Sequence, residues 1–387
     1  MYNIQTLNKI SPLGLELFKE GSYNISDKID NPDAILVRSY VMHDMELPKS
    51  LKAIARAGAG VNNIPIDKCS EKGIVVFNTP GANANAVKEL TVAALLLSSR
   101  KIIEGIQWAK SLAGEGANVP KLVEKGKADF TGPEILGKKL GVIGLGAIGV
   151  MVANAANSLG MEVTGFDPYI SVDAAWGLSR NVKKAPDFRS LLENSDYITL
   201  HVPLTGETKD LINYDKFSLM KKGVRLLNFS RAELVNNEDL KRAIQEGIVD
   251  TYVTDFPSEE LLNMEHVIAI PHLGASTPES EDNCAVMAAN QLRDFLENGN
   301  ITNSVNFPSC ELNRSSDFRV TVAHKNIPNM VGQISTILAK EQINILNMIN
   351  RSKGNLAYTI IDAEENIPED VVCRLQNIEG VLSVRII

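Results

Sequence analysis

The sequence predicts an α/β protein with two domains built on parallel sheets, followed by a small βαββαβ module at the C-terminal end. Three observations support this fold class. Short apolar runs typical of buried strands alternate with helical segments between residues 34 and 297. A glycine-rich turn with the spacing G-x-G-x-x-G occupies residues 144–149, near the middle of the chain. After residue 318 the pattern changes to four strands and two helices.

Composition bounds the class of protein. A chain of 387 residues holds two or three domains, and 44% hydrophobic with 22% charged residues is ordinary globular composition. The net charge of −8 argues against a nucleic-acid partner. The four cysteines are far apart and form no C-x-x-C, so neither a disulfide framework nor a metal site is expected. With no signal pattern and no apolar run long enough to span a bilayer, we expect a cytoplasmic protein without membrane contact.

The first domain begins with three predicted strands. Each is an apolar run bounded by turn residues, as where Thr79, Pro80 and Gly81 follow the third. A helix from about residue 85 to residue 101 crosses into the second domain. No dinucleotide fingerprint occurs in this first part. The three strands are Ala34–Arg38, Leu51–Arg56 and Gly73–Asn78.

The second domain opens on the glycine-rich turn, which lies between a strand at 139–143 and a helix at 150–159. Gly144 allows a tight turn, Gly146 lets the backbone approach a pyrophosphate, and Gly149 lets the helix pack close to the strand. The helix N-terminus presents N–H groups to the phosphates, next to Ala147 and Ile148. A second strand, 162–166, ends at Asp167, whose carboxylate suits ribose hydroxyls and repels a 2′-phosphate. The pattern therefore predicts a binding site for NAD rather than NADP.

The same alternation continues to a long helix at 277–297, which is long enough to return to the first domain. The sequence thus predicts two Rossmann-like parallel-sheet domains with a cleft between them. We expect a discontinuous substrate-binding domain, 1–95 and 278–305, and an NAD-binding domain, 96–277. The NAD-binding domain contains further predicted elements after Asp167. These are strands at 197–202, 225–229, 251–256 and 267–270, and helices at 190–193 and 237–246.

The C-terminal module, 316–387, has the layout of a ferredoxin-like fold. Exposed edges of so small a sheet favour pairing with a second copy of the chain. Its predicted strands are 318–322, 343–349, 356–362 and 381–387, and its predicted helices are 330–340 and 369–377.

Candidate catalytic residues follow strands of the second domain, where ligands of such sheets bind. His272 comes directly after a strand and suits proton exchange with a hydroxyl. Arg231 follows another strand, and its guanidinium can clamp a carboxylate and polarise the adjacent carbonyl. A carboxylate bonded to an imidazole orients it and raises its pKa, and both Glu259 and Glu260 are candidates for that role.

Two arginines of the first domain are candidates for a phosphate site. Arg38 and Arg56 each follow a strand that points into the expected cleft. Two guanidiniums suit a phosphate, which a simple lactate would not need. The alternative is that Arg56 only supports its loop or holds the carboxylate.

Several segments together resemble the D-isomer-specific 2-hydroxyacid dehydrogenase family over nearly the whole chain. The resemblance implies a catalytic set of Arg231, Glu259 and His272, although Glu260 stands where the family usually has proline. It implies that Gly58 and Ala59 line the substrate site with Arg38 and Arg56. It also implies cofactor contacts from the glycine-rich turn and from Asp167, His201, Val202, Pro203, Thr205, Ser230, Asp255 and Gly274, with Asp255 displaced by one from the family's usual aspartate. The segments that carry it are Arg56–Asn63, Asn78–Gly81, Glu89–Thr91, Gly144–Gly149, His201–Thr205, Ser230–Arg231 and Pro271–Gly274.

The run Arg56–Asn63 is most similar to that of family members acting on phosphoglycerate. We therefore expect NAD-dependent oxidation of D-3-phosphoglycerate to 3-phosphohydroxypyruvate, the entry step to L-serine. One alternative is a related enzyme acting on glycerate, lactate or another phosphorylated hydroxy acid. The other is a non-enzymatic NAD-sensing protein on the same fold.

The C-terminal module resembles an ACT domain. The resemblance implies that L-serine binds as a feedback effector between paired modules, held by His324, Asn326 and Asn344, in a homodimer or homotetramer. Asn329 replaces the glycine usual at its position, and asparagine tolerates a left-handed backbone. The alternative is that the module only assembles subunits.

Overall fold

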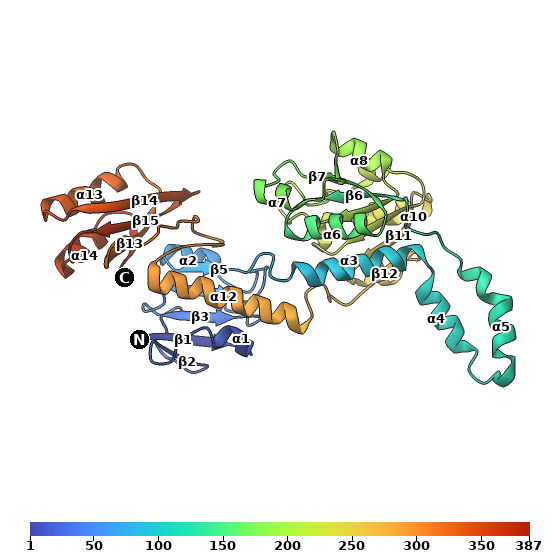
Figure 1. The fold of residues 1–387 in the computed structure, drawn as a ribbon, viewed down its shortest axis with the longest axis horizontal. Helices are drawn as coiled ribbons and strands as arrows, with labels where there is room; N and C mark the ends of the chain where they lie inside the picture. The colour runs from blue at the N-terminus through green and yellow to red at the C-terminus, as the bar shows by residue number, and fades with distance from the viewer. The chain divides into compact units, whose positions relative to one another are not determined.

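The computed structural model describes residues 1–387 and divides into two compact units, Met1–Asn83 with Pro278–Ile387, and Ala84–Thr277. Figure 1 shows the elements of each unit, coloured along the chain. The α/β class with parallel sheets and a separate antiparallel sheet is confirmed. None of the helices is long and apolar enough to cross a membrane.

The first unit contains a five-stranded sheet in the order β2-β1-β3-β4-β5, with every neighbouring pair parallel. The three predicted strands are present, each somewhat shorter than expected. Two N-terminal strands were not predicted, because their mixed polar and apolar residues form no continuous buried run. The elements are β1 (Tyr2–Leu7), α1 (Pro12–Leu15), β2 (Tyr23–Ser26), β3 (Ala34–Val37), β4 (Ala53–Arg56), α2 (Ile66–Glu71) and β5 (Val75–Phe77).

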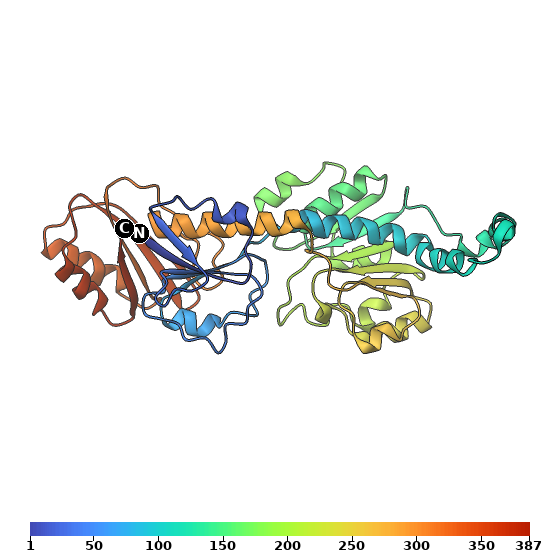
Figure 2. The same cartoon turned by 90° about the horizontal axis from the view of Figure 1, so that it is seen from below.

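The long helix α12 (Pro278–Asn298) belongs to the first unit, as its predicted return requires. It packs against α1 and the sheet, and its buried residues join the core of this unit. Phe295 stacks edge-on against Phe77 of β5 at 5.5 Å between ring centroids. Figure 2 shows α12 running alongside the strands of this unit.

The second unit is a seven-stranded, wholly parallel sheet in the order β12-β11-β10-β9-β6-β7-β8. Helices cover both of its faces, and two buried apolar clusters fill the space beneath them. Its elements are α3 (Ala84–Ser99), β6 (Lys139–Ile143), α6 (Ala147–Ser158), β7 (Glu162–Phe166), α7 (Val172–Gly177), β8 (Lys183–Lys184), α8 (Phe188–Asn194), β9 (Tyr197–Leu200), α9 (Tyr214–Phe217), β10 (Val224–Asn228), η3 (Ala232–Leu234), α10 (Asn237–Gln245), β11 (Val249–Thr254), α11 (Glu259–Leu262) and β12 (Val267–Ala269).

A helical arm between α3 and β6 was not predicted from the sequence. None of its helical residues is buried, so the apolar pattern that identifies a core helix is weak there. Trp108 packs against Phe130 at 5.1 Å between ring centroids and holds the two ends of the arm together. The arm comprises α4 (Ile102–Ser111), η1 (Gly116–Asn118), α5 (Val119–Gly126) and η2 (Lys127–Phe130).

The C-terminal module has the predicted βαββαβ order, and its antiparallel sheet runs β14-β15-β13-β16. Asn329 precedes α13 with φ of 65°, the left-handed conformation that its replacement of glycine requires. Strand β14 forms one edge of the sheet. The elements are β13 (Phe318–Lys325), α13 (Met330–Lys340), β14 (Ile345–Lys353), β15 (Leu356–Ala363), α14 (Glu369–Gln376) and β16 (Val381–Ile386).

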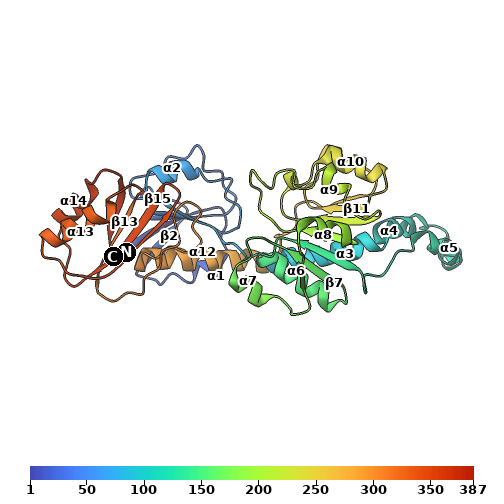
Figure 3. The ribbon, with the colours of Figure 1, turned by 90° about the horizontal axis from the view of Figure 1, so that it is seen from above.

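Both faces of this module's sheet are covered. Helices α13 and α14 cover one face, over a cluster that includes Val320 and Ile361. The other face packs on the first unit's own core, where Tyr358 and Ile360 join the cluster around Phe295. This packing explains why the module and the N-terminal sheet form one compact unit. Figure 3 shows β13 and β15 next to the five-stranded part.

Side chains of the module and its linker also bind the last carbonyls of α12. Arg385 donates to the carbonyls of Phe295 and Leu296, at 3.2 and 3.1 Å. Arg319 donates to that of Asn298 at 2.8 Å. Cations at a helix C-terminus satisfy its free carbonyls and complement its dipole. Side chains of the module therefore hold it on the backbone carbonyls at the C-terminal end of α12.

The boundary between the units lies at residues 83 and 84. The sequence placed it at 95, which falls inside α3. Because α3 is continuous and its buried face packs against α6 and the seven-stranded sheet, the whole helix belongs to the second unit.

Candidate functional site

The glycine-rich turn joins β6 to α6 with the geometry that its sequence predicts. Gly144 has φ of +90°, and a Cβ there would lie 2.5 Å from the carbonyl oxygen of His201. A Cβ on Gly149 would lie 1.9 Å from the carbonyl oxygen of Gly144. Gly146 has no atom within 4 Å of its Cβ position, so the backbone is open to a ligand at the start of α6. Together these features form a cradle for phosphate oxygens.

Asp167 follows β7, the strand next to β6. Its Oδ2 accepts a hydrogen bond from the amide of Leu145 at 2.8 Å, and its Oδ1 accepts one from the amide of Tyr169 at 2.8 Å. The carboxylate is therefore held against the glycine-rich turn and stays partly exposed. This position suits the ribose hydroxyls of a dinucleotide.

His201 lies at the end of β9, where its carbonyl forms the opposite side of the turn from Gly144. Its Nε2 is 2.9 Å from the Oγ1 of Thr199, and its buried Nδ1 has no partner. Burial lowers the pKa of His201 from 6.5 to about 3. The imidazole is thus neutral, and one of its two ring nitrogens has no hydrogen-bond partner. Thr205 continues this segment in a turn closed by Thr208, whose Oγ1 donates to the carbonyl of Pro203.

We expect the imidazole resonances of His201 to stay at their neutral positions from pH 8 down to pH 5, because its pKa lies near 3. Its neutral form contributes stability that is complete above the unfolded pKa of about 6.5 and is lost as pH falls toward 3. Proton NMR titration measures this, and the spectrum of His201→Gln identifies the resonance. A midpoint between pH 6 and 7 for that resonance contradicts the prediction.

Three neighbouring strands, β10, β11 and β12, bring the candidate catalytic residues to one edge of the sheet. Arg231 follows β10, Asp255 follows β11 and His272 follows β12. Because the three strands are parallel, their carboxyl ends meet at this edge. The candidate residues Arg231 and His272 therefore lie at the same edge of the sheet, and both side chains are exposed.

The backbone before Arg231 is organised by Asn228, a buried residue that the sequence analysis missed. Its Nδ2 donates to the carbonyl of Arg231 at 2.9 Å, and its Oδ1 accepts from the amide of Ser230 at 3.2 Å. The hydroxyl of Ser230 donates to the carbonyl of Leu200 on β9 at 2.9 Å. An asparagine at a strand end is a weak sequence signal, because only the folded loop reveals its two backbone partners.

Asp255 holds the segment that carries His272. Its carbonyl accepts the amide of His272 at 3.0 Å, and its Oδ2 accepts the amide of Gly274 at 3.0 Å. The other carboxylate oxygen is buried without a partner. Burial raises the pKa of Asp255, while the bond from Gly274 and the charges of His272 and Arg231 act in the opposite direction. A buried acceptor without a partner near the candidate catalytic residues is the kind of group that the N–H of a ligand can satisfy.

Neither candidate glutamate contacts His272 in this structure. Glu259 is exposed and accepts a hydrogen bond from Asn263 at 3.1 Å. Glu260 accepts one from Asn237 at 3.0 Å. The ring of His272 instead packs against Phe256, with 5.1 Å between the ring centroids. The choice between the two glutamates therefore stays a prediction.

Comparison with known proteins identifies the family. Residues 92–274 match the family described as D-isomer specific 2-hydroxyacid dehydrogenase, NAD binding domain. The chain is 34% identical over 381 residues to a D-3-phosphoglycerate dehydrogenase of Methanocaldococcus jannaschii, covering 92% of this chain and 70% of that protein. The chain belongs to the D-isomer-specific 2-hydroxyacid dehydrogenases. It is an NAD-dependent oxidoreductase, as the predicted fingerprint at Gly144–Gly149 requires.

Two further dehydrogenases are also similar to this chain. A D-3-phosphoglycerate dehydrogenase of Escherichia coli is 30% identical over 364 residues, which cover 90% of this chain and 85% of that protein. The crystal structure of an NAD+-bound 3-phosphoglycerate dehydrogenase from Entamoeba histolytica superposes with a TM-score of 0.60 at 27% identity, covering 79% of this chain and 98% of that chain.

The first unit of this dehydrogenase brings Arg38 and Arg56 together at the ends of adjacent parallel strands, β3 and β4. The Nε of Arg56 donates to the carbonyl of Arg38 at 3.0 Å, and its Nη1 binds the carbonyl of Gly60. The guanidinium of Arg38 pairs with Glu281 on α12, and both side chains are substantially exposed. A Cβ on Gly58 would lie 2.8 Å from the Nη1 of Arg56, so glycine leaves room for the guanidinium.

The effector candidates fall at two ends of the C-terminal module's sheet. His324 is buried near the end of β13, where its Nε2 lies 3.0 Å from the Oγ1 of Thr359. Asn326 follows it and donates to the carbonyl of Gly354 at 3.1 Å. Asn344 precedes β14 and donates to Glu364 at 2.8 Å, at the opposite end of the sheet. One copy of the module therefore does not bring the three together.

Proposed function

We propose that this dehydrogenase interconverts D-3-phosphoglycerate and 3-phosphohydroxypyruvate with NAD, the first step toward L-serine. The observation that carries the choice of substrate is the placement of Arg38 and Arg56 at the ends of adjacent parallel strands, since two guanidiniums match a phosphate dianion. Relatives named for phosphoglycerate match most of the chain and support the same choice. The four cysteines are unpaired, which supports a reducing compartment, the cytoplasm, as the place of the reaction.

The glycine-rich turn, Asp167 and the strand ends after β9, β10 and β12 would hold NAD. The unpartnered oxygen of Asp255 and the neutral imidazole of His201 are polar groups that its ring and carboxamide can use. When bound, NAD accepts the hydride from C2 of the hydroxy acid.

The chain's own residues bind the acid and move the proton. Arg231 binds the substrate carboxylate and polarises the C2 oxygen. His272 accepts the hydroxyl proton during oxidation and returns it during reduction. The backbone bonds from Asp255 fix the segment that carries the imidazole. One hydride and one proton leave the alcohol, so the reaction balances as hydroxy acid plus NAD+ to oxo acid, NADH and a proton.

Turnover of 3-phosphohydroxypyruvate with NADH by the purified full chain tests the proposal. We expect faster turnover, measured as kcat/KM, than with hydroxypyruvate or pyruvate. Equal kcat/KM for hydroxypyruvate would favour a dehydrogenase of unphosphorylated acids. Tight NADH binding without turnover of any oxo acid would favour an NAD-sensing protein.

We expect Arg56→Ala to lower kcat/KM for 3-phosphohydroxypyruvate about 10- to 100-fold, and to change kcat/KM for hydroxypyruvate much less. Loss of a charge-assisted bond costs about 1.5–3 kcal/mol, which corresponds to that range. Side-by-side kinetics with both oxo acids give the answer. Equal losses for the two substrates would mean that Arg56 only supports its loop, through the carbonyls of Arg38 and Gly60.

We also propose that L-serine binds between two copies of the C-terminal module. Asn344 lies at the opposite end of the sheet from His324 and Asn326, so a ligand held by all three needs a second copy. The edge strand β14 supplies unpaired backbone groups for such pairing. We expect L-serine to inhibit the wild type and not Asn344→Ala. Inhibition that survives this substitution would remove Asn344 from the effector site, and no inhibition of the wild type would leave the module a role in assembly.

A homodimer is supported by the helical arm as well. Its helix α4 exposes large apolar side chains, among them Ile102 and Ile106, with exposed fractions of 42% and 50%. Exposed apolar side chains gathered on a surface favour contact with another protein. Sedimentation of the full chain and of Ile106→Glu tests this proposal, since a weakened dimer in the variant supports it and an unchanged one does not.

A further inference from the structure

A pocket of about 500 Å³ lies within the first unit, between the N-terminal sheet and the C-terminal module. One side comes from the loop before β4 and from the α2–β5 connection. The other side comes from strand β16, with Tyr358 of β15 and Phe295 of α12 completing the lining. This volume is within the usual range for sites of small molecules, about 300–1,000 Å³. None of the residues given a role above in catalysis or in serine binding lines it.

The charged side chains that line this junction pocket are all positive. Lys49, Lys52, Lys72 and Arg385 line it, and no aspartate or glutamate does. The whole chain has a net charge of −8, so this concentration of cations departs from the rest of the protein. Asp33 pairs with Lys52 from outside the lining and neutralises one charge. Three cations remain, and a concave wall of one sign of charge attracts ligands of the opposite sign.

The cations come from both sides of the pocket and are held in place. Lys72, the residue after α2, donates from its Nζ to the carbonyl of Leu47 at 2.8 Å. Arg385 stacks on the ring of Phe295, with its guanidinium carbon 4.3 Å from the ring centroid. Its two bonds to α12 carbonyls leave further N–H groups for an acceptor. An ordered guanidinium and ammonium facing one cavity lose little freedom when an anion binds.

The two sides approach closely at Gly73. This residue has φ of +70°, and a Cβ there would lie 3.0 Å from the Cβ of Leu382 and 3.0 Å from the Oγ of Ser383. Only glycine combines that conformation with this contact without displacing β16. The two sides of the pocket are therefore in close contact at Gly73, where β16 lies against the α2–β5 connection.

We propose that this junction pocket binds a small, multiply charged phosphate compound and ties the C-terminal module to the substrate-binding sheet. Lysine ammoniums bind phosphate oxygens as point charges, and the guanidinium of Arg385 adds paired N–H donors. The same guanidinium binds the end of α12, so the ligand would bind next to the helix that begins at Pro278, six residues after His272. The site is separate from the active site and does not depend on which hydroxy acid is the substrate.

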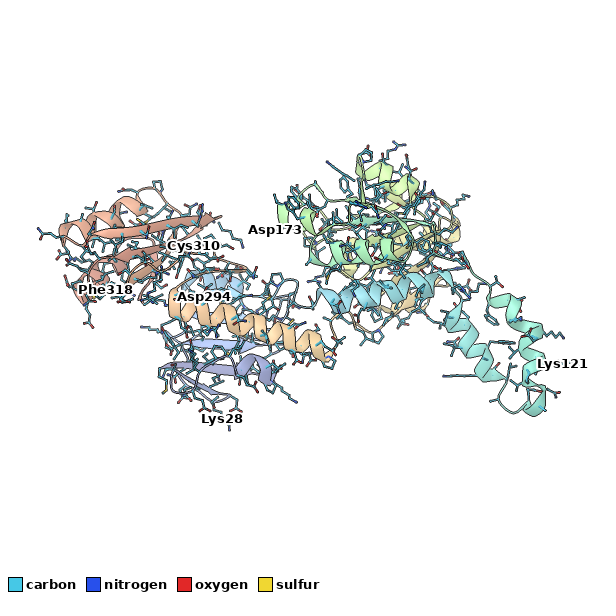
Figure 4. The ribbon with its side chains drawn as sticks, in the orientation of Figure 1. Lys28, Lys121, Asp173, Asp294, Cys310 and Phe318 are labelled. Atoms are coloured by element: carbon cyan, nitrogen blue, oxygen red, sulfur yellow. The ribbon has the colours of Figure 1, made fainter.

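Binding of pyrophosphate, glycerol 2-phosphate, inorganic phosphate and citrate to the full chain tests this proposal, at constant ionic strength and with NADH saturating. Isothermal titration calorimetry gives the dissociation constant of each. We expect Lys49→Gln/Lys72→Gln to weaken binding at least tenfold and to leave kcat/KM without these anions unchanged. The matched control is Lys28→Gln/Lys340→Gln, which removes two exposed lysines elsewhere; Figure 4 labels Lys28.

Equal binding by the wild type and Lys49→Gln/Lys72→Gln would overturn the proposal, as would no binding to the wild type. Citrate binding as tightly as pyrophosphate would contradict the choice of phosphate. Preference for glycerol 2-phosphate over inorganic phosphate would identify a phosphorylated metabolite as the source, and the reverse preference would identify the free ion. Gly73→Val, which forces a strained side chain against Leu382 and Ser383 of β16 without removing charge, should also weaken binding if the ligand lies there.

Discussion

Replacing His272 by asparagine is expected to lower kcat/KM by about 10²–10⁴-fold in both directions, because the C2 oxygen loses its proton partner. The imidazole is exposed, and its ring packs against that of Phe256. The backbone of the loop is held by Asp255 through the amides of His272 and Gly274, and neither bond uses the imidazole. Folding and NADH affinity should therefore stay close to wild type, as measured by thermal unfolding and by NADH fluorescence.

The matched control for this loss is His266→Asn. His266 is also exposed and has φ of 63°, a conformation that asparagine tolerates. It lies before β12, whereas His272 lies after it. We expect kcat/KM of His266→Asn within about twofold of wild type. A similar loss in both variants, or a loss in His272→Asn that tracks weaker NADH binding, would assign His272 a structural role.

The same kinetics separate the two glutamates. Glu259→Gln and Glu260→Gln remove one charge each from adjacent residues of α11. If the Glu259 carboxylate forms a hydrogen bond with His272 when substrate binds, Glu259→Gln should lower kcat and Glu260→Gln should not. Catalytic hydrogen bonds that are absent without substrate often form in the complex. Loss confined to Glu260→Gln would move the assignment by one residue.

The geometry of the glycine-rich turn could be predicted from the sequence because its constraints are local. One strand–helix–strand segment contains the glycines at 144, 146 and 149 and Asp167. Each of these residues is required by a steric or electrostatic constraint within that segment. The placement of Arg231 and His272 at one edge of the sheet was predictable for a related reason, since parallel strands end at the same edge. The helical arm was missed because its residues bury no apolar face.

Residues that act through tertiary contacts could not be predicted. Asn228 organises the Arg231 loop only because its amide reaches two backbone groups in the folded turn. The packing of the C-terminal sheet on α12 depends on Tyr358 and Arg385, whose partners are 59 and 90 residues away in the chain. No local pattern marks a partly buried arginine that binds another element's carbonyl.

The largest loss of stability is expected from Arg319→Ala, which should lower the free energy of unfolding of the first unit by about 3–5 kcal/mol. Arg319 and Asp362 are fully buried, and two hydrogen bonds of 2.6 and 2.9 Å join them. The substitution leaves the Asp362 carboxylate buried with only Ser315 as its partner, and it removes the bond to the last carbonyl of α12. Urea unfolding, monitored separately for each transition, measures the loss.

The double variant Arg319→Met/Asp362→Leu shows whether the loss of stability in Arg319→Ala comes from the unpaired buried charge of Asp362 or from lost packing. Replacing both members of a buried pair by apolar residues is often nearly neutral, so the double variant should regain most of the loss. Burial alone disfavours ionised Asp362, but the bonds from Arg319 and Ser315 outweigh it and hold its pKa below the ordinary value. Its contribution is therefore complete above the unfolded pKa of about 3.9 and disappears as pH falls through the lower folded value. A double variant less stable than Arg319→Ala would show instead that the pair holds the C-terminal module on α12.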